Sequence, residues 1–209
     1  ENAAAVVIDA TIAITDADDT NIASATVTIT SVVVGDVLGF TTQNGITGVY
    51  TSGTGVLALS GTATLAQYQA ALRSVTYNSA SEDPTVNNTR NNRTITWNVT
   101  DANSDAVGAQ TSVGVTSNIN LTAVNDTTIV VAGGTLNYTE NATAAIIDAT
   151  ITITDTDDTH IANATVTITS VVTGDVLGFA TQNGIHGVYT SCTGVLALSG
   201  TATLAQYQA

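Results

Sequence analysis

Two acidic clusters carry carboxylates that lie close enough along the chain to bind one cation. The stretch Asp16-Ala17-Asp18-Asp19 lies between two segments typical of β-strands, and Asp155-Thr156-Asp157-Asp158 repeats it. Calcium takes about six to eight oxygen ligands, so two or three carboxylates from one loop need further oxygens from other segments. The sequence therefore predicts a calcium site at each of these loops, completed by polar residues from elsewhere in the fold.

The segments around the clusters show the alternation typical of half-buried strands. Residues 25–30 and 94–99 alternate β-branched with small or polar residues. This period of two places Val27 and Ile29 on a buried face and the intervening threonines on a solvent face. The same reasoning predicts further strands over residues 6–15, 37–42, 48–51, 56–60, 74–78, 110–122 and 128–131.

One helix and one tight hairpin complete the predicted elements. Leu65, Tyr68 and Leu72 follow one another at spacings of three and four, which predicts a short helix. Residues 50–56 carry the glycines of a hairpin turn. Many short strands separated by turn signals predict an all-β, two-layer sandwich with one short helix in each repeat.

The second part of the chain repeats the first. Residues 140–209 match residues 1–70 at a shift of 139 positions, with eleven substitutions among seventy. Such a long period indicates a tandem array. We place the boundary near Asp126, which gives a first domain over residues 1–126 and the start of the next identical repeat over residues 127–209. On this division the first domain lacks its opening strand and the second lacks its closing strands.

Two hypotheses follow from these incomplete domains. In one, neighbouring copies complete each other, and the strand over residues 128–139 of one chain pairs with the first domain of another to build a fibre. In the other, the 209 residues are simply cut from a longer repetitive protein. Under both hypotheses we expect the chain to be part of something longer.

Strand directions in a sandwich predict which loops meet. We expect the hairpin with Asp101, Asn103 and Asp105 at the same end of the first domain as the first acidic cluster. At the other end we expect a junction site that combines Glu1, Glu82 or Asp83, Asn125 and Asp126 with the second cluster. The full set of candidate calcium ligands is Glu1, Asp16, Asp18, Asp19, Glu82, Asp83, Asp101, Asn103, Asp105, Asn125, Asp126, Glu140, Asp155, Asp157 and Asp158.

The alternative for each of these residues is an ordinary turn. Asp favours turns because its carboxylate accepts hydrogen bonds from nearby backbone amides. The run that starts at Asp101 resembles the start of an EF-hand loop. We reject an EF-hand because Ala106 stands at the sixth position, which needs Gly, and no Glu stands at the twelfth.

The charge balance excludes several classes of partner. The chain has 17 acidic residues, three Arg and no Lys, and its formal net charge is −14. Because three Arg side chains cannot neutralise many phosphates, we expect no nucleic-acid partner and no binding to an anionic membrane. No apolar run is long enough for a transmembrane helix, and no basic start precedes an apolar stretch, so we expect no signal peptide in these residues. The single Cys excludes an internal disulfide, and the lack of Lys excludes a Schiff base and a P-loop.

Catalysis finds little support in the sequence. Both histidines, His160 and His186, are replaced in the first copy, and Cys192 stands where the first copy has Gly53. Trp97 alternates with apolar residues on a predicted strand, which favours a core position. We therefore predict that the protein is not an enzyme. A glycan-binding module is the alternative function, although few aromatic residues are present to stack against sugars.

Four stretches resemble the cadherin-like and RTX-adhesin repeats of very large bacterial surface proteins. They are Gln43-Asn44-Gly45-Ile46, residues 55–64, residues 68–77 and Ala123-Val124-Asn125-Asp126. The resemblance implies immunoglobulin-like sandwiches in tandem, secretion to the cell surface, and calcium held at domain junctions. We therefore expect a non-catalytic structural repeat of an extracellular adhesin or a self-assembling filament, with neighbouring copies and calcium as partners.

Overall fold

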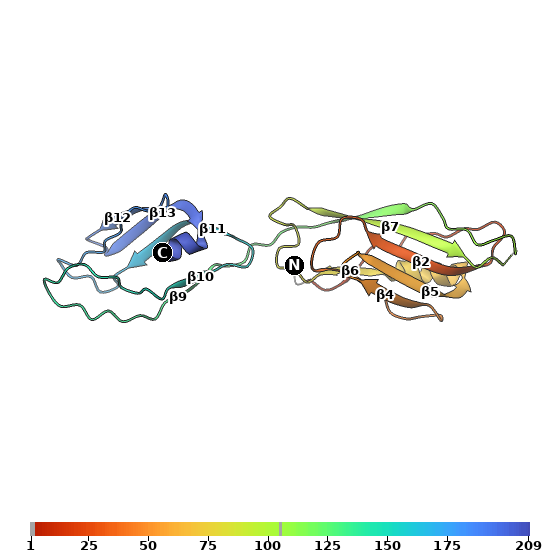
Figure 1. Cartoon of the computed structure of the whole chain (residues 1–209), viewed down its shortest axis with the longest axis horizontal. Helices are drawn as coiled ribbons and strands as arrows, with labels where there is room; N and C mark the ends of the chain where they lie inside the picture. The colour runs from red at the N-terminus through yellow and green to blue at the C-terminus, as the bar shows by residue number, and fades with distance from the viewer. Residues whose placement is uncertain (1–2, 105) are drawn as a thin grey trace. The chain divides into compact units, whose positions relative to one another are not determined.

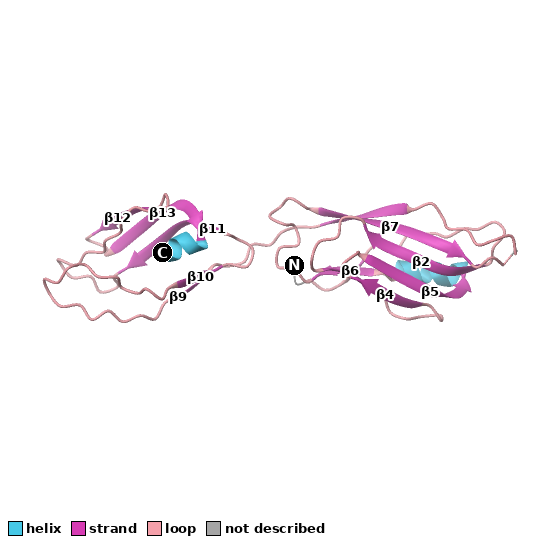
Figure 2. Ribbon diagram, viewed as in Figure 1, coloured by secondary structure: helices cyan, strands magenta, loops and turns pink. Residues whose placement is uncertain are grey.

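The chain is mostly β-strand, as the sequence predicts. The computed structural model describes residues 3–104 and 106–209, with 40% strand and 7% helix (Figures 1 and 2). Contacts divide the chain into two compact units, Glu1–Val124 and Asn125–Ala209. We call them unit 1 and unit 2. The division falls two residues before the boundary that we place at Asp126.

Unit 1 contains two antiparallel sheets and one helix. The larger sheet has the order β4-β5-β2-β7-β8, and the smaller one has the order β1-β6-β3 (Figure 2). The helix α1, Leu65–Arg73, connects β5 to β6. The strands are β1 (Val6–Val7), β2 (Asn21–Ile29), β3 (Asp36–Gly39), β4 (Thr47–Thr51), β5 (Val56–Thr64), β6 (Thr76–Ser79), β7 (Asn92–Asp101) and β8 (Val115–Asn120).

One core joins both sheets and the helix. On β2, Val27 and Ile29 are buried while Thr26 is exposed, so the predicted alternation is confirmed. Trp97 of β7 is 2% exposed and donates its ring N–H to the Ser117 hydroxyl at 3.0 Å, which confirms its core position. The smaller sheet contributes Leu38 and Tyr77, and the helix contributes Tyr68, Ala71 and Leu72.

The helix prediction is also confirmed. Thr64 caps α1, because its hydroxyl accepts the Gln67 N–H and the Gln67 side chain accepts the Thr64 N–H. Thr203 makes the same capping box for α2, Leu204–Gln208, in unit 2. Within residues 3–104 and 106–209, no helix has the length and apolar character to cross a membrane.

Two predicted strands of unit 1 are much shorter in the structure. The strand predicted over residues 6–15 is reduced to β1, because side chains bind the rest. Asp9 accepts the Thr11 N–H at 2.8 Å, and Arg73 and Gln69 bond the backbone of Ile12 and Ile14. The strand predicted over residues 110–122 is regular only in β8, with one isolated bridge before it.

Unit 2 repeats part of this arrangement. Its larger sheet has the order β11-β13-β12, and a second sheet pairs β9 with β10. The prediction of a strand over residues 128–139 is too long, because Gly133 and Gly134 turn their N–H groups to Asp148 after β9 ends. The strands are β9 (Ile129–Val131), β10 (Thr152–Thr154), β11 (His160–Thr167), β12 (His186–Thr190) and β13 (Val195–Thr203).

Candidate metal centres

The structure gathers each acidic cluster at the start of a strand. In unit 1 the loop before β2 brings oxygen atoms of Asp16, Asp18 and Asp19 within 4.8 Å of one another. The N–H groups of Asp18 and Asp19 both donate to Asp16 Oδ1, at 3.2 and 3.0 Å. These two bonds lower the pKa of Asp16, because they favour its charged form. The loop is therefore held in a shape that points several carboxylates at one place.

The loop after β7 lies against this first cluster. Ser104 donates both its N–H and its hydroxyl to Asp19 Oδ1, and the Thr20 N–H donates to the Ser104 hydroxyl at 3.1 Å. Asp19 is consequently only 8% exposed. The prediction that these two loops meet at one end of the first domain is confirmed.

Asp101 and Asn103 shape the second of these loops. The Asp101 carboxylate accepts the Asn103 N–H at 2.9 Å and the Gln110 N–H at 2.6 Å. Asn103 Oδ1 accepts the Gly108 N–H at 2.6 Å. Both side chains therefore stabilise the turn, which is the role we weighed against calcium binding. Asp105 and Glu1 lie outside the described residues.

The second cluster forms hydrogen bonds with the first residues of unit 2. Oxygen atoms of Asp155, Asp157 and Asp158 lie within 4.8 Å of one another. The Asp126 N–H donates to both carboxylate oxygens of Asp157, at 3.3 and 3.2 Å, and the Thr128 hydroxyl donates to Asp155 Oδ2 at 2.6 Å. The segment that opens unit 2 is thus tied to its acidic loop.

The charges in this cluster interact. The hydroxyl of Thr128 and the Asp158 N–H lower the pKa of Asp155. Partial dehydration and the neighbouring Asp155 carboxylate raise the pKa of Asp157, although the Asp126 N–H opposes this effect. A carboxylate whose pKa is raised by its neighbours is stabilised when a cation joins the cluster. The donor set, with carboxylate and hydroxyl oxygens and no sulfur or imidazole, fits a hard cation such as calcium.

The two equivalent clusters face different segments in the two units. In unit 1 the cluster faces the loop at Ser104, and in unit 2 the equivalent cluster faces the opening segment at Asp126 and Thr128. The sequence reasoning missed both hydroxyls. Ser104 could have been found inside the Asp101-Ala102-Asn103-Ser104 turn. Thr128 could have been found from Asp126, two residues earlier, which the sequence already placed at the second cluster.

The side chains of the remaining candidates are placed by other contacts. Asp83, beside Glu82 in the loop from β6 to β7, accepts the Asn87 N–H at 2.7 Å and the Thr85 hydroxyl at 3.1 Å. Leu121 donates to Asn91 at 2.8 Å, so this loop lies at the end of unit 1 where β8 ends, opposite the first cluster. Glu140 lies in an exposed turn, and the Asn125 side chain donates to the Asp126 carbonyl.

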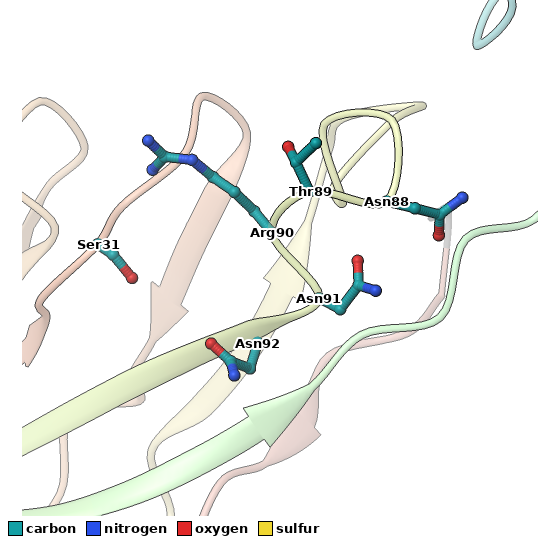
Figure 3. A pocket seen from close by; sticks show the side chains of 6 residues that line it. All are labelled: Ser31, Asn88, Thr89, Arg90, Asn91 and Asn92. Carbon is teal, nitrogen blue, oxygen red and sulfur yellow. The ribbon is translucent and has the colours of Figure 1, made fainter.

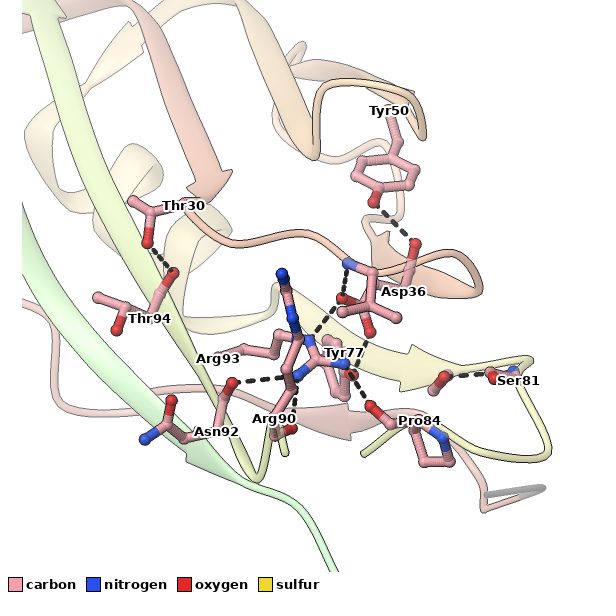
Figure 4. Close-up of polar contacts among 12 residues, drawn as sticks. Thr30, Asp36, Tyr50, Tyr77, Ser81, Pro84, Arg90, Asn92, Arg93 and Thr94 are labelled. Atoms are coloured by element: carbon pink, nitrogen blue, oxygen red, sulfur yellow. Dashed lines mark hydrogen bonds and ion pairs between the residues drawn. The ribbon is translucent and has the colours of Figure 1, made fainter. Parts of the chain in front are cut away.

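A buried charge pair is the other polar feature of unit 1, and the sequence reasoning missed it. Arg93 Nε donates to Asp36 Oδ2 at 2.6 Å, and both side chains are fully buried (Figure 4). Tyr77 donates to Asp36 Oδ1 at 2.6 Å, and the Val33 N–H donates to Oδ2 at 2.7 Å. Burial and the bond to Asp36 raise the pKa of Tyr77. The signal available in the sequence was that Arg93 is one of only three cations.

One open hollow of unit 1 is lined by polar side chains. No aromatic residue is among those that line it, so it offers no surface on which a sugar ring could stack. The hollow lies beside the start of β7 (Figure 3), and its lining residues are Ser31, Asn88, Thr89, Arg90, Asn91 and Asn92.

Comparisons with protein-family models, curated proteins and solved structures found no match to this chain. Its function is therefore inferred from its own residues.

Proposed function

We propose that the chain is a non-catalytic structural repeat of a large bacterial extracellular adhesin or self-assembling surface filament. In this proposal the two units belong to a tandem series of immunoglobulin-like, cadherin-like sandwiches. Calcium binds the acidic loops and stiffens the junction where one sandwich follows another. The repeat therefore acts mechanically, as a spacer of defined length.

The bonds from Asp126 and Thr128 to the second cluster carry the proposal. They join the segment that opens unit 2 to the loop with the densest negative charge in that unit. A cation bound there would hold the opening segment and the loop together, and without it the carboxylates repel one another. The 17 acidic residues against three Arg leave calcium as the natural counter-charge.

Two features of unit 1 support the sandwich. Its two antiparallel sheets share one core, and Thr-rich faces point outward from the larger sheet. Strand complementation between neighbouring copies is part of the proposal. In it, β9 of one chain would leave β10 and pair with the first domain of another chain.

Calcium titration of the whole chain tests the proposal. We expect calcium to bind, to raise the melting temperature of unit 2, and to lengthen the particle in X-ray scattering relative to the same protein in a chelator. Asp157→Asn should weaken binding because it removes a carboxylate from the cluster. The matched control is Asp175→Asn, which removes one exposed carboxylate outside both clusters.

Three results would reject the calcium function. They are an unchanged melting temperature and length in a chelator, an equal loss of affinity in both variants, and binding of magnesium as tight as that of calcium. A glycan array serves the alternative function. Selective sugar binding would favour a glycan-binding module, whereas a spacer should show no preference.

A further inference from the structure

β11 of unit 2 has an unpaired edge, whereas its counterpart in unit 1 is fully paired. In unit 1, β2 lies between β5 and β7 and forms hydrogen-bonded ladders with both. In unit 2, β11 pairs with β13 alone and ends its sheet. A free edge of eight residues presents unpaired N–H and C=O groups to any segment that can add a strand.

The face beside this edge exposes residues that unit 1 buries. Val27 is 0% exposed, while its identical counterpart Val166 is 40% exposed. Ala164 and Ile168 are likewise more exposed than Ala25 and Ile29. Other pairs are buried in both units, such as Ile46 and Ile185, and Leu57 and Leu196.

The acceptor for the buried charge pair is already formed in unit 2. Asp175, the counterpart of Asp36, accepts the Val172 N–H at 2.9 Å, and the Tyr189 hydroxyl donates to its carbonyl at 2.9 Å. The same two bonds hold Asp36 in unit 1. Asp175 differs in being exposed, because no arginine lies over it.

Residues 71–124 supply the missing partner in unit 1. They contain β6, β7 and β8, the Tyr77 hydroxyl and Arg93, and Arg93 reaches Asp36 from this segment (Figure 4). All three arginines of the chain lie in this segment, whereas residues 125–209 carry seven acidic residues and no Lys or Arg. The free edge, the exposed apolar residues and the charge of the acceptor surface therefore all match one segment.

We propose that the free edge of β11 and the preformed Asp175 carboxylate of unit 2 are a docking surface for a second copy of residues 71–124. The incoming β7 would pair with β11 in the register in which it pairs with β2. Its arginine would form a buried ion pair with Asp175. This inference does not rest on calcium binding, so either proposal can fail without the other.

The test adds a synthetic segment of residues 71–124 to the whole chain in the presence of a chelator. We expect a one-to-one complex by titration calorimetry and slower hydrogen exchange of the β11 amides. The Arg93→Gln segment should bind at least about thirtyfold more weakly, since truncating one partner of a buried charge pair is costly. The Arg90→Gln segment removes the same charge from an exposed side chain and should change affinity less than about threefold.

A reciprocal variant and a linked form complete the test. Asp175→Asn in the chain should weaken binding as much as Arg93→Gln does in the segment. If the free segment aggregates, the same residues can be joined after Ala209, which corresponds to Ala70, and the β11 amides should then become protected. The inference is overturned if no complex forms and the joined form leaves β11 unprotected, if Arg93→Gln and Arg90→Gln bind equally, or if protection appears outside unit 2.

Discussion

Replacing Asp36 with Asn removes the negative charge from the buried network of unit 1 and leaves the Arg93 guanidinium as an unpaired cation. The shape of the side chain is unchanged, and the new amide oxygen can still accept the Val33 N–H. The perturbation therefore acts on the charge pair and leaves the packing of the core in place.

The structure sets the expected size of the effect. Breaking a buried pair by removing one partner costs about 3–5 kcal/mol. Arg93 also donates to the carbonyls of Pro84, Arg90 and Asn92, at 2.6, 3.0 and 3.1 Å, and these bonds soften the loss. We therefore expect about 3 kcal/mol less unfolding free energy for unit 1. At about 4 °C for each kcal/mol in a unit of this size, its melting temperature should fall by about 12 °C.

Urea unfolding followed by tryptophan fluorescence measures this directly. Trp97 is the single Trp of the chain and is buried in unit 1, so its signal reports that unit alone. With a urea slope of about 2 kcal/mol/M, the midpoint should fall by about 1.5 M. Asp175→Asn is the control, because the same substitution at an exposed site should leave the Trp97 transition unchanged.

Two outcomes would refute this reasoning. One is a loss below about 1 kcal/mol for Asp36→Asn, which would mean that the carbonyl bonds alone stabilise the buried cation. The other is an equal shift of the Trp97 transition in both variants, which would mean that burial of the pair is not the cause.

Three further predictions concern single residues. Gly61→Ala should destabilise unit 1 by more than about 1 kcal/mol, because φ is +121° and a Cβ would overlap the Gly45 carbonyl; Gly53→Ala, in open space, should be nearly neutral in the same urea assay. Thr64→Ala should cost about 1 kcal/mol through loss of the capping box, measured likewise. Bonds from the Thr150 hydroxyl and two glycine N–H groups lower the pKa of Asp148. The contribution of this carboxylate to stability is therefore present above the ordinary Asp pKa and is lost as pH falls through the lower folded-state pKa. Titration of Asp148 followed by carbon NMR checks this.

Each of these predictions has a contradicting result. Equal stability of the two glycine variants would mean that the positive φ of Gly61 does not require glycine. A neutral Thr64→Ala would mean that packing alone holds the helix. An Asp148 carboxyl that titrates at the usual Asp value would mean that the hydrogen bonds from its N–H and hydroxyl donors are not formed in solution.

The sequence predicts the parts of the fold that depend on periodicity and on local turns. The alternation through β2, the short helix and the hairpin between β4 and β5 all follow from neighbouring residues. The acidic loops were also found from their spacing. Ser104 and Arg93 were not predicted as partners of Asp19 and Asp36, because they come from positions 85 and 57 residues away.

The repeated sequence separates what is local from what is not. Residues 35–40 and 174–179 are identical. In both copies a Val just before this stretch, Val33 or Val172, donates its N–H to the Asp carboxylate three residues later. Only the first of these stretches becomes a strand, β3, because only there does β6 lie beside it. The same partner segment buries Asp36. Asp175 has no such segment over it and is exposed. Sequence alone determined the turn, since its bonds lie within four residues, and tertiary structure decided the strand and the buried charge, since both need atoms from a distant segment.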